Sequence, residues 1–159
     1  MGSRSKLDSA YIAGFLDGDG SLMLQIKKRR DSKSKTRFMA TICFYQDSRH
    51  EKPLFWIKRV LGIGYISRRN DGITELRING YAQTARILTS LLPHIRFKKK
   101  QAQALSKAVR ILAGSKFALL SKKQIEKLID LILSIQQENY VTKRKKTKQE
   151  LLSSFGLTL

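Results

Sequence analysis

The sequence IAGFLDGDGS, at residues 12–21, combines a short apolar run with three glycines and two aspartates. Asp8 and Ser9 precede this run and are typical residues for the N-cap of a helix. Gly18 and Gly20 follow it, and glycine commonly ends a helix. The stretch therefore predicts a first helix that begins near Asp8 and stops at the second or third glycine.

This predicted helix has two notable features, a face of small residues and an acidic C-terminal end. Ala10, Gly14 and Gly18 recur every four residues, so they share a face with little side-chain bulk that another helix can approach closely. Asp17 and Asp19 fall at the C-terminal end, where the helix dipole disfavours a carboxylate unless a cation compensates. A metal ion is one such cation. The alternative is that both carboxylates only cap local turns.

The charge balance of the chain points to a polyanionic partner. Its 159 residues include 32 Lys and Arg against 12 Asp and Glu, a formal net charge of +20. Such a domain typically binds nucleic acid, because Lys and Arg displace the condensed counterions. A membrane surface is the competing polyanion, but no apolar run approaches the roughly 20 residues that span a bilayer. The sequence also lacks a signal-peptide pattern.

These features lead us to expect a soluble intracellular protein, in an organelle or a prokaryotic cytoplasm, that does not act at a membrane. The single Cys43 excludes an internal disulfide and a cysteine-based zinc site. We expect residues 1–5 to be a cloning remnant outside the fold. Residues 6–159 are expected to form one domain with a helical C-terminal extension.

The rest of the chain predicts an α+β fold. We expect strands at 21–26, 38–45, 63–68 and 73–79, and further helices at 53–61, 81–92, 98–112, 121–139 and from residue 147. Consecutive hairpins favour an antiparallel, saddle-shaped sheet with helices on one face, in the order αββαββα plus C-terminal helices. Ser121 and Thr147 begin capping boxes. The chain after Tyr140 has few apolar residues, and we do not expect it to pack firmly.

The first predicted hairpin has a dense basic tip and a basic face. Seven of the eleven residues from Lys27 to Arg37 are Lys or Arg. Alternation places one set of side chains on one face of the sheet, and a two-stranded ribbon fits the DNA major groove. The alternative is a solvated charged surface. The predicted DNA contacts on this hairpin are Gln25, Lys27, Lys28, Arg29, Arg30, Lys33, Lys35, Arg37, Thr41 and Cys43.

Two other segments are interpreted in the same way. Arg69, Glu75 and Arg77 lie on the second predicted hairpin and are expected to face a DNA groove. The basic run at residues 143–146 lies before the last predicted helix, where Lys143 and Lys145 either contact phosphates or belong to a solvated tail.

Residues 12–20, read together, resemble the signature of the LAGLIDADG homing endonucleases. Residues 44–46, 62–66 and 96–102 also look like the single-motif branch of that family. The resemblance covers about residues 11–103, whereas the C-terminal helices match in kind only. It implies a sequence-specific endonuclease that hydrolyses phosphodiesters in both strands of duplex DNA.

The resemblance also implies roles for individual residues. Asp19 matches the metal-ligating carboxylate of the family, and the carbonyl of Gly18 matches its backbone ligand. Gln46 and Lys98 match catalytic residues around the scissile phosphate, where Gln46 would hold water and Lys98 would offset developing negative charge. Asp17 would orient the end of the helix.

The single-motif branch acts as a homodimer, so the resemblance implies a near-palindromic DNA site. The dimer interface is predicted at Ala10, Ala13, Gly14 and Asp17. The expected cofactor is Mg²⁺, with Mn²⁺ or Ca²⁺ able to occupy the same site, and no small-molecule cofactor is expected. His50 stands near a position where the family often has Arg. It departs from that pattern, but it is included among the predicted DNA contacts.

Two alternatives stay open at this point. The chain could be an RNA-splicing maturase or a non-cleaving DNA-binding protein of the same fold. It could also be a basic RNA-binding protein of the ribosomal kind, which would recognise RNA by its shape. The sequence does not specify the target site, because readout depends on side-chain geometry, bridging water and DNA deformability.

Overall fold

The computed structural model describes residues 5–28, 36–116 and 119–159. Its elements are α1 (Lys6–Asp19), β1 (Gly20–Lys28), β2 (Thr36–Asp47), the short 3₁₀ helix η1 (Ser48–His50), α2 (Lys52–Leu61), β3 (Tyr65–Arg68), β4 (Ile73–Asn79), α3 (Tyr81–Leu91), α4 (Lys99–Ala113), α5 (Lys122–Glu138) and α6 (Lys148–Ser153). This order confirms the predicted αββαββα succession with further helices at the C-terminal end. None of the helices in these ranges is long and apolar enough to cross a membrane.

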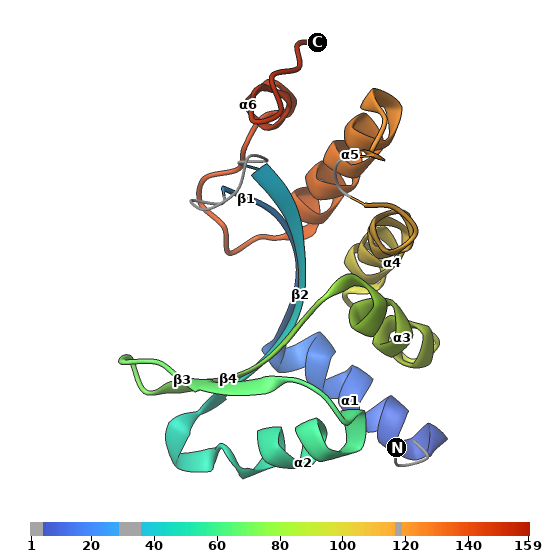
Figure 1. Ribbon diagram of the computed structural model, residues 1–159. Helices are drawn as coiled ribbons and strands as arrows, with labels where there is room; N and C mark the ends of the chain where they lie inside the picture. Colours follow the sequence, from blue (N-terminus) through green and yellow to red (C-terminus); the bar gives the residue numbers. More distant parts are fainter. Residues whose placement is uncertain (1–4, 29–35, 117–118) are drawn as a thin grey trace.

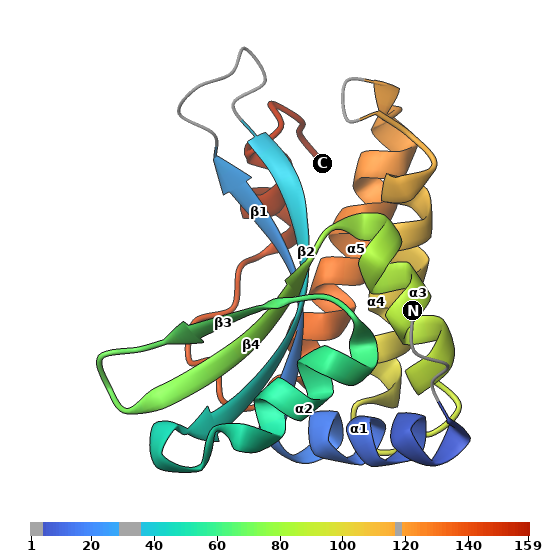
Figure 2. The ribbon, with the colours of Figure 1, turned by 60° about the horizontal axis from the view of Figure 1, so that its bottom comes forward.

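The four strands form one antiparallel sheet in the order β1-β2-β4-β3. The sheet is strongly curved, with α1, α3, α4 and α5 packed on its convex side and the concave side left open (Figures 1 and 2). The predicted α+β class, with an antiparallel saddle and helices on one face, is therefore confirmed. The open side is the surface that determines what the sheet can bind.

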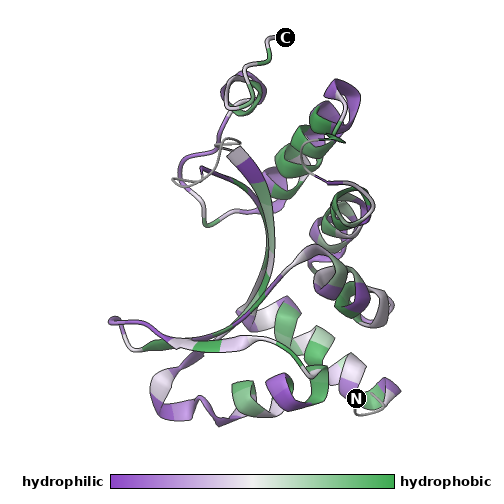
Figure 3. Cartoon of the chain, viewed as in Figure 1, coloured by the Kyte–Doolittle hydropathy of each residue, from purple (hydrophilic) through white to green (hydrophobic). Residues whose placement is uncertain are grey.

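Alternation along the strands separates the core from the open face. Leu24, Ile42, Phe44 and Leu76 point toward the helices and are buried, whereas odd-numbered strand residues point to the open side. Burying each of these large apolar side chains stabilises the fold by about 1.5–3 kcal/mol. The tip of the β3–β4 hairpin and most of the segment between α5 and α6 are hydrophilic (Figure 3).

The beginning of α1 differs from the prediction. Ser5 is the N-cap, and its side chain accepts a hydrogen bond from the backbone N of Asp8. The helix therefore starts earlier than Asp8 and Ser9 suggested, because the capping residue lies three residues before the donor. Ser5 thus caps the first helix of the fold.

The end of α1 agrees with the prediction, since the helix stops at Asp19. A side chain on the next residue, Gly20, would place Cβ 2.9 Å from the Cα of Leu16. Glycine is therefore required where the chain leaves α1 for β1, and this tight exit fixes the position of Asp19.

The helix ends and caps predicted elsewhere in the chain are also confirmed. Gly62 ends α2 with a positive φ of 71°, and both Ser121 and Thr147 form the predicted capping boxes. The expectation of a loosely packed tail is wrong for α6, whereas residues 141–147 are exposed as expected. Leu151 and Leu152 of α6 are buried, and Phe155 stacks on Phe38 of β2 with ring centroids 5.0 Å apart.

Candidate active site and nucleic-acid interface

The C-terminal end of α1 carries the two predicted acidic residues in different environments. The side chain of Asp19 is exposed and makes no hydrogen bond with the described residues. Asp17 is buried, and its carboxylate accepts hydrogen bonds from the backbone N of Arg96, Phe97 and Lys98, at 2.7, 3.2 and 3.0 Å. One aspartate therefore faces solvent, while the other is fully engaged within the chain.

Lys98, the residue directly before α4, also contacts the C-terminal end of α1. Its Nζ donates to the carbonyl oxygen of Leu16 at 3.0 Å and to that of Asp17. Burial lowers the pKa of the Lys98 ammonium, and the negative charges of Asp17 and Asp19 oppose this effect. The structure thus brings Lys98 to the end of α1, about 80 positions earlier in the sequence.

Gln46 lies near the end of β2, at the edge where α1 passes into β1. In the register, Phe44 pairs with Gly20, so Gln46 extends past the start of β1 toward the end of α1. Its Oε1 accepts a hydrogen bond from the backbone N of Asp47 at 2.9 Å. The side chain is half-buried. The structure places Gln46 at the same end of the sheet as the exposed aspartate.

Only two of the four residues predicted at the dimer interface are accessible on the single chain. Ala10 and Gly14 are exposed on α1, but Ala13 has no exposed surface and Asp17 is 8% exposed in the single chain. Ala13 faces the core, and Asp17 turns toward the loop before α4. The prediction is therefore wrong for these two residues, because spacing along one helix cannot tell which flank packs against its own chain.

The open face of the sheet carries several predicted DNA contacts. Gln25, Lys27 and Arg37 lie on this face, where Lys27 pairs with Arg37 across the β1–β2 ladder. Lys28 is exposed at the end of β1. Arg29, Arg30, Lys33 and Lys35 lie outside the described residues.

Two predicted contacts on this face are buried. Thr41 and Cys43 have no exposed surface, and Thr41 Oγ1 donates to Oδ1 of Asn79 at 2.8 Å. Burial raises the pKa of the Cys43 thiol to about 11. Strand alternation assigned the correct face, but both residues lie on the central strand of a curved sheet, where neighbouring side chains cover them. They do not form a contact surface, so these two predictions are wrong.

Glu75 is also buried, between two arginines that remain accessible. Arg69 Nη1 donates to Oε1 of Glu75 at 3.1 Å, and Arg77 Nη1 donates to Oε2 at 2.8 Å. Arg69 Nη2 also donates to Oδ2 of Asp71 at 2.6 Å. Glu75 therefore holds the arginines rather than offering its carboxylate to a base, which corrects its predicted role as a contact residue.

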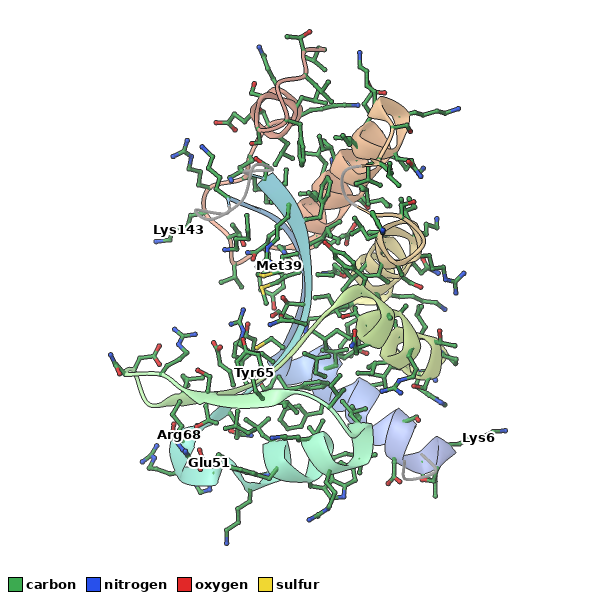
Figure 4. The ribbon with its side chains drawn as sticks, in the orientation of Figure 1. Lys6, Met39, Glu51, Tyr65, Arg68 and Lys143 are labelled. Carbon is green, nitrogen blue, oxygen red and sulfur yellow. The ribbon has the colours of Figure 1, made fainter. Side chains whose placement is uncertain are left out.

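The remaining predicted contacts are accessible. His50 is exposed in η1, and Lys143 and Lys145 are exposed between α5 and α6. Lys143 lies on the same open side of the sheet as Met39 and Tyr65 (Figure 4). The basic segment is thus located beside the concave face and not on the helical side.

Tyr65 and Asn79 also belong to the open face, although neither was among the predicted contacts. Both are exposed, and Asn79 Nδ2 donates to the hydroxyl of Tyr65 at 3.3 Å. Tyr65 pairs with Arg77 across β3 and β4. The strand alternation that selected Arg77 would have found Tyr65 once the register between these strands was known.

The fold and this site define a class of protein. A curved antiparallel sheet offers a basic open face to a polyanion, and an exposed carboxylate with a neighbouring lysine lies at one end of it. The sequence model of the LAGLIDADG endonuclease family matches residues 12–112. The chain belongs to this LAGLIDADG endonuclease family.

Two curated relatives agree with this assignment. DNA endonuclease I-CvuI of Chlorella vulgaris is 31% identical over 111 residues, which cover 70% of this chain and 69% of that protein. DNA endonuclease I-CreI of Chlamydomonas reinhardtii is 30% identical over 106 residues, which cover 67% of this chain and 64% of that protein.

Solved structures extend the likeness to nearly the whole chain. I-CvuI in complex with its target in the presence of Ca has a TM-score of 0.79 and 25% identity, covering 97% of this chain and 98% of that one. I-SmaMI bound to uncleaved DNA has a TM-score of 0.74 and 20% identity, a likeness of fold alone. The match covers 95% of this chain but 49% of I-SmaMI.

Proposed function

We propose that this chain is a site-specific endonuclease that cuts both strands of a near-palindromic DNA duplex as a homodimer, with Mg²⁺ as its cofactor. The observation that carries the proposal is the exposed Asp19 carboxylate at the end of α1, where its charge acts on the Lys98 ammonium at one end of the basic sheet face. Membership of the LAGLIDADG endonuclease family supports the reaction type.

The oxygen atoms at the end of α1 fit a divalent cation. The Asp19 carboxylate and the Gly18 carbonyl are hard ligands at the negative end of a helix dipole, which suits Mg²⁺ or Ca²⁺. A bound divalent cation would polarise a phosphodiester and activate water for attack. I-CvuI has been crystallised with DNA in the presence of Mg and of Ca, which supports divalent-metal use.

One chain supplies too few ligands for such an ion. The described residues contain no group of three His, Cys, Asp or Glu side chains able to hold a metal. A second copy meeting the first at α1 would bring a second Asp19, and DNA phosphates would complete the ligand set. The incomplete site thus supports a dimer that becomes competent on DNA.

An exposed stripe along α1 supports the same assembly. Leu7, Tyr11, Gly14 and Gly18 lie at i, i+4, i+7 and i+11 and share one face of the helix. Leu7 is 83% exposed and Tyr11 is 63% exposed. Large apolar side chains beside glycines form a surface that a second α1 can cover while the two backbones come close.

Other residues of the chain bind the duplex and stabilise the charge that develops during cleavage. The open sheet face binds the duplex, with Arg69 and Arg77 as candidates for bidentate contacts to guanine. Lys98 places a positive charge beside the scissile phosphate, where it offsets negative charge that develops during cleavage. Lys143 and Lys145 are positioned to contact phosphates next to the sheet.

The test begins with selection of cleaved sites from a random duplex library in Mg²⁺. On the selected site, Asp19→Asn should lower single-turnover cleavage by orders of magnitude while duplex binding persists, because shape is kept and charge is lost. EDTA should stop cleavage and added Mg²⁺ should restore it. Cleavage that continues in EDTA, or in Asp19→Asn, would contradict the metal assignment.

A further inference from the structure

Asp17 and Lys98 connect α1 and α4 in both directions. The Asp17 carboxylate accepts the backbone N–H groups of residues 96–98, directly before α4. Lys98 Nζ donates back to the last carbonyls of α1, those of Leu16 and Asp17. The end of α1 and the segment that leads into α4 are therefore each held by a side chain from the other.

Neither helix end has a cap of its own. The N-cap residue of α4 is Lys98, whose side chain makes no capping hydrogen bond. The last turn of α1 contains no basic residue. An acid is favourable at a helix N-terminus and a cation is favourable at a C-terminus. Asp17 and Lys98 supply these two charges across the contact, which explains how a buried acid is tolerated at the end of α1.

We propose that Asp17 is a positioning residue for DNA cleavage, which fixes Lys98 relative to Asp19 by holding the backbone of residues 96–98 against the end of α1. Asp17 is 8% exposed and all of its hydrogen bonds lie within the chain, so it acts through Lys98 and not on the substrate. This inference rests on the proposed function, which assigns Asp19 and Lys98 to cleavage.

The first experiment uses Asp17→Asn, which keeps the size of the side chain but removes its charge and one of its two acceptor oxygens. The single-turnover cleavage rate should fall about 10–100-fold, as is usual when a supporting partner of a site residue is lost. The dissociation constant for the duplex should stay at the parent value, because the open sheet face is unchanged. Asp130→Asn, the same change at an exposed position of α5, should alter neither quantity.

A double-mutant cycle separates positioning from a general loss of structure. Lys98→Met removes the ammonium but keeps the length of the side chain. If Asp17 acts through Lys98, adding Asp17→Asn to Lys98→Met should lower the rate no further, because coupled residues are not additive. Additive losses, or a parent rate in Asp17→Asn, would overturn the inference.

Thermal unfolding of each variant checks that it folds. If Asp17→Asn does not fold, Asp17→Glu takes its place, because it keeps the charge and both oxygens but displaces them by one methylene. The same selective loss of rate is expected from it. The two proposals fail differently: additive losses with Asp19→Asn still inactive would overturn this inference alone, whereas a parent chain that does not cleave would overturn both.

Discussion

Glu75 shows how a single carboxylate can prepare two arginines for DNA. Its two oxygens bind one guanidinium each, from Arg69 and Arg77, and its own surface is nearly closed to solvent. The side-chain hydrogen bond to Glu75 also raises the pKa of both arginines. The remaining guanidinium donors are held in place before DNA arrives, so less side-chain entropy is lost on binding.

Glu75→Gln should therefore change specificity and affinity in opposite directions. The two arginines lose their common partner, and discrimination between the selected site and a scrambled duplex should fall by about 1–3 kcal/mol. Binding to the scrambled duplex should strengthen at low salt, since the open sheet face of each chain loses one negative charge. Competition binding at several salt concentrations measures both effects. Glu126→Gln, the same change on α5, should leave discrimination intact, and a Glu75→Gln protein with parent discrimination would show that Glu75 does not position the arginines.

At the scale of elements, Glu51 ties the β3–β4 hairpin to the start of α2. Arg68 Nη2 of β3 donates to Oε1 of Glu51 at 2.6 Å, and Thr74 Oγ1 of β4 donates to Oε2 at 2.6 Å. Ser48 shares a hydrogen bond of 2.9 Å with the Thr74 hydroxyl. Glu51 and Arg68 lie together below the sheet, away from the open face (Figure 4). This link sets the direction of the hairpin that carries Arg69 and Arg77.

The link should make stability depend on pH. The Arg68 hydrogen bond, and then that of Thr74, lower the pKa of Glu51. Protonation of Glu51 therefore opposes folding. Its ionised carboxylate stabilises the fold fully above the ordinary Glu pKa of about 4.3, and this stabilisation is lost as pH falls through the lower pKa of Glu51 in the folded protein. Urea unfolding should find Glu51→Gln less stable than the parent at pH 7, with the difference shrinking at acidic pH. In an Arg68→Gln background, adding Glu51→Gln should cost much less stability at pH 7, because the main partner of Glu51 is already gone. If Glu51→Gln destabilises the protein equally at all pH values, this account is wrong.

At the scale of the whole molecule, the glycines of the IAGFLDGDGS stretch have different reasons to be glycine. A Cβ on Gly20 would collide with Leu16, whereas a Cβ on Gly14 or Gly18 would meet nothing within 4 Å. Gly20 is therefore required by the chain itself. Gly14 and Gly18 weaken an isolated helix without any gain inside the chain, which agrees with a close contact between two copies.

Gly14→Leu should separate folding from assembly. Gly14 is exposed and a Cβ there meets nothing within 4 Å, so the stability of the single chain should hold or rise by up to about 1 kcal/mol, because Leu is the better helix former. Two α1 helices could no longer approach, so sedimentation should find monomers and double-strand cleavage should disappear. Ala113→Leu, at an exposed position near the end of α4, should keep the dimer. A dimeric Gly14→Leu protein would show that subunits meet elsewhere.

Structural features that depend only on residues close together in the chain were determined by the sequence itself. The Ser121 and Thr147 capping boxes, the Gly62 terminator and the end of α1 all follow from groups within about four positions of one another. Strand alternation likewise assigned Lys27, Arg37 and Arg77 to the open face. The basic character of that face is therefore a property of the sequence.

Only the tertiary structure decided which residues of the site are free to act. Asp17 and its backbone donors lie 79–81 positions apart, and no local pattern pairs them. Thr41 and Cys43 have the alternation of surface residues but are covered at the centre of a curved sheet. Exposure and partnership depend on how distant segments pack and how the sheet bends, whereas periodicity along the chain specifies only the direction in which a side chain leaves its element.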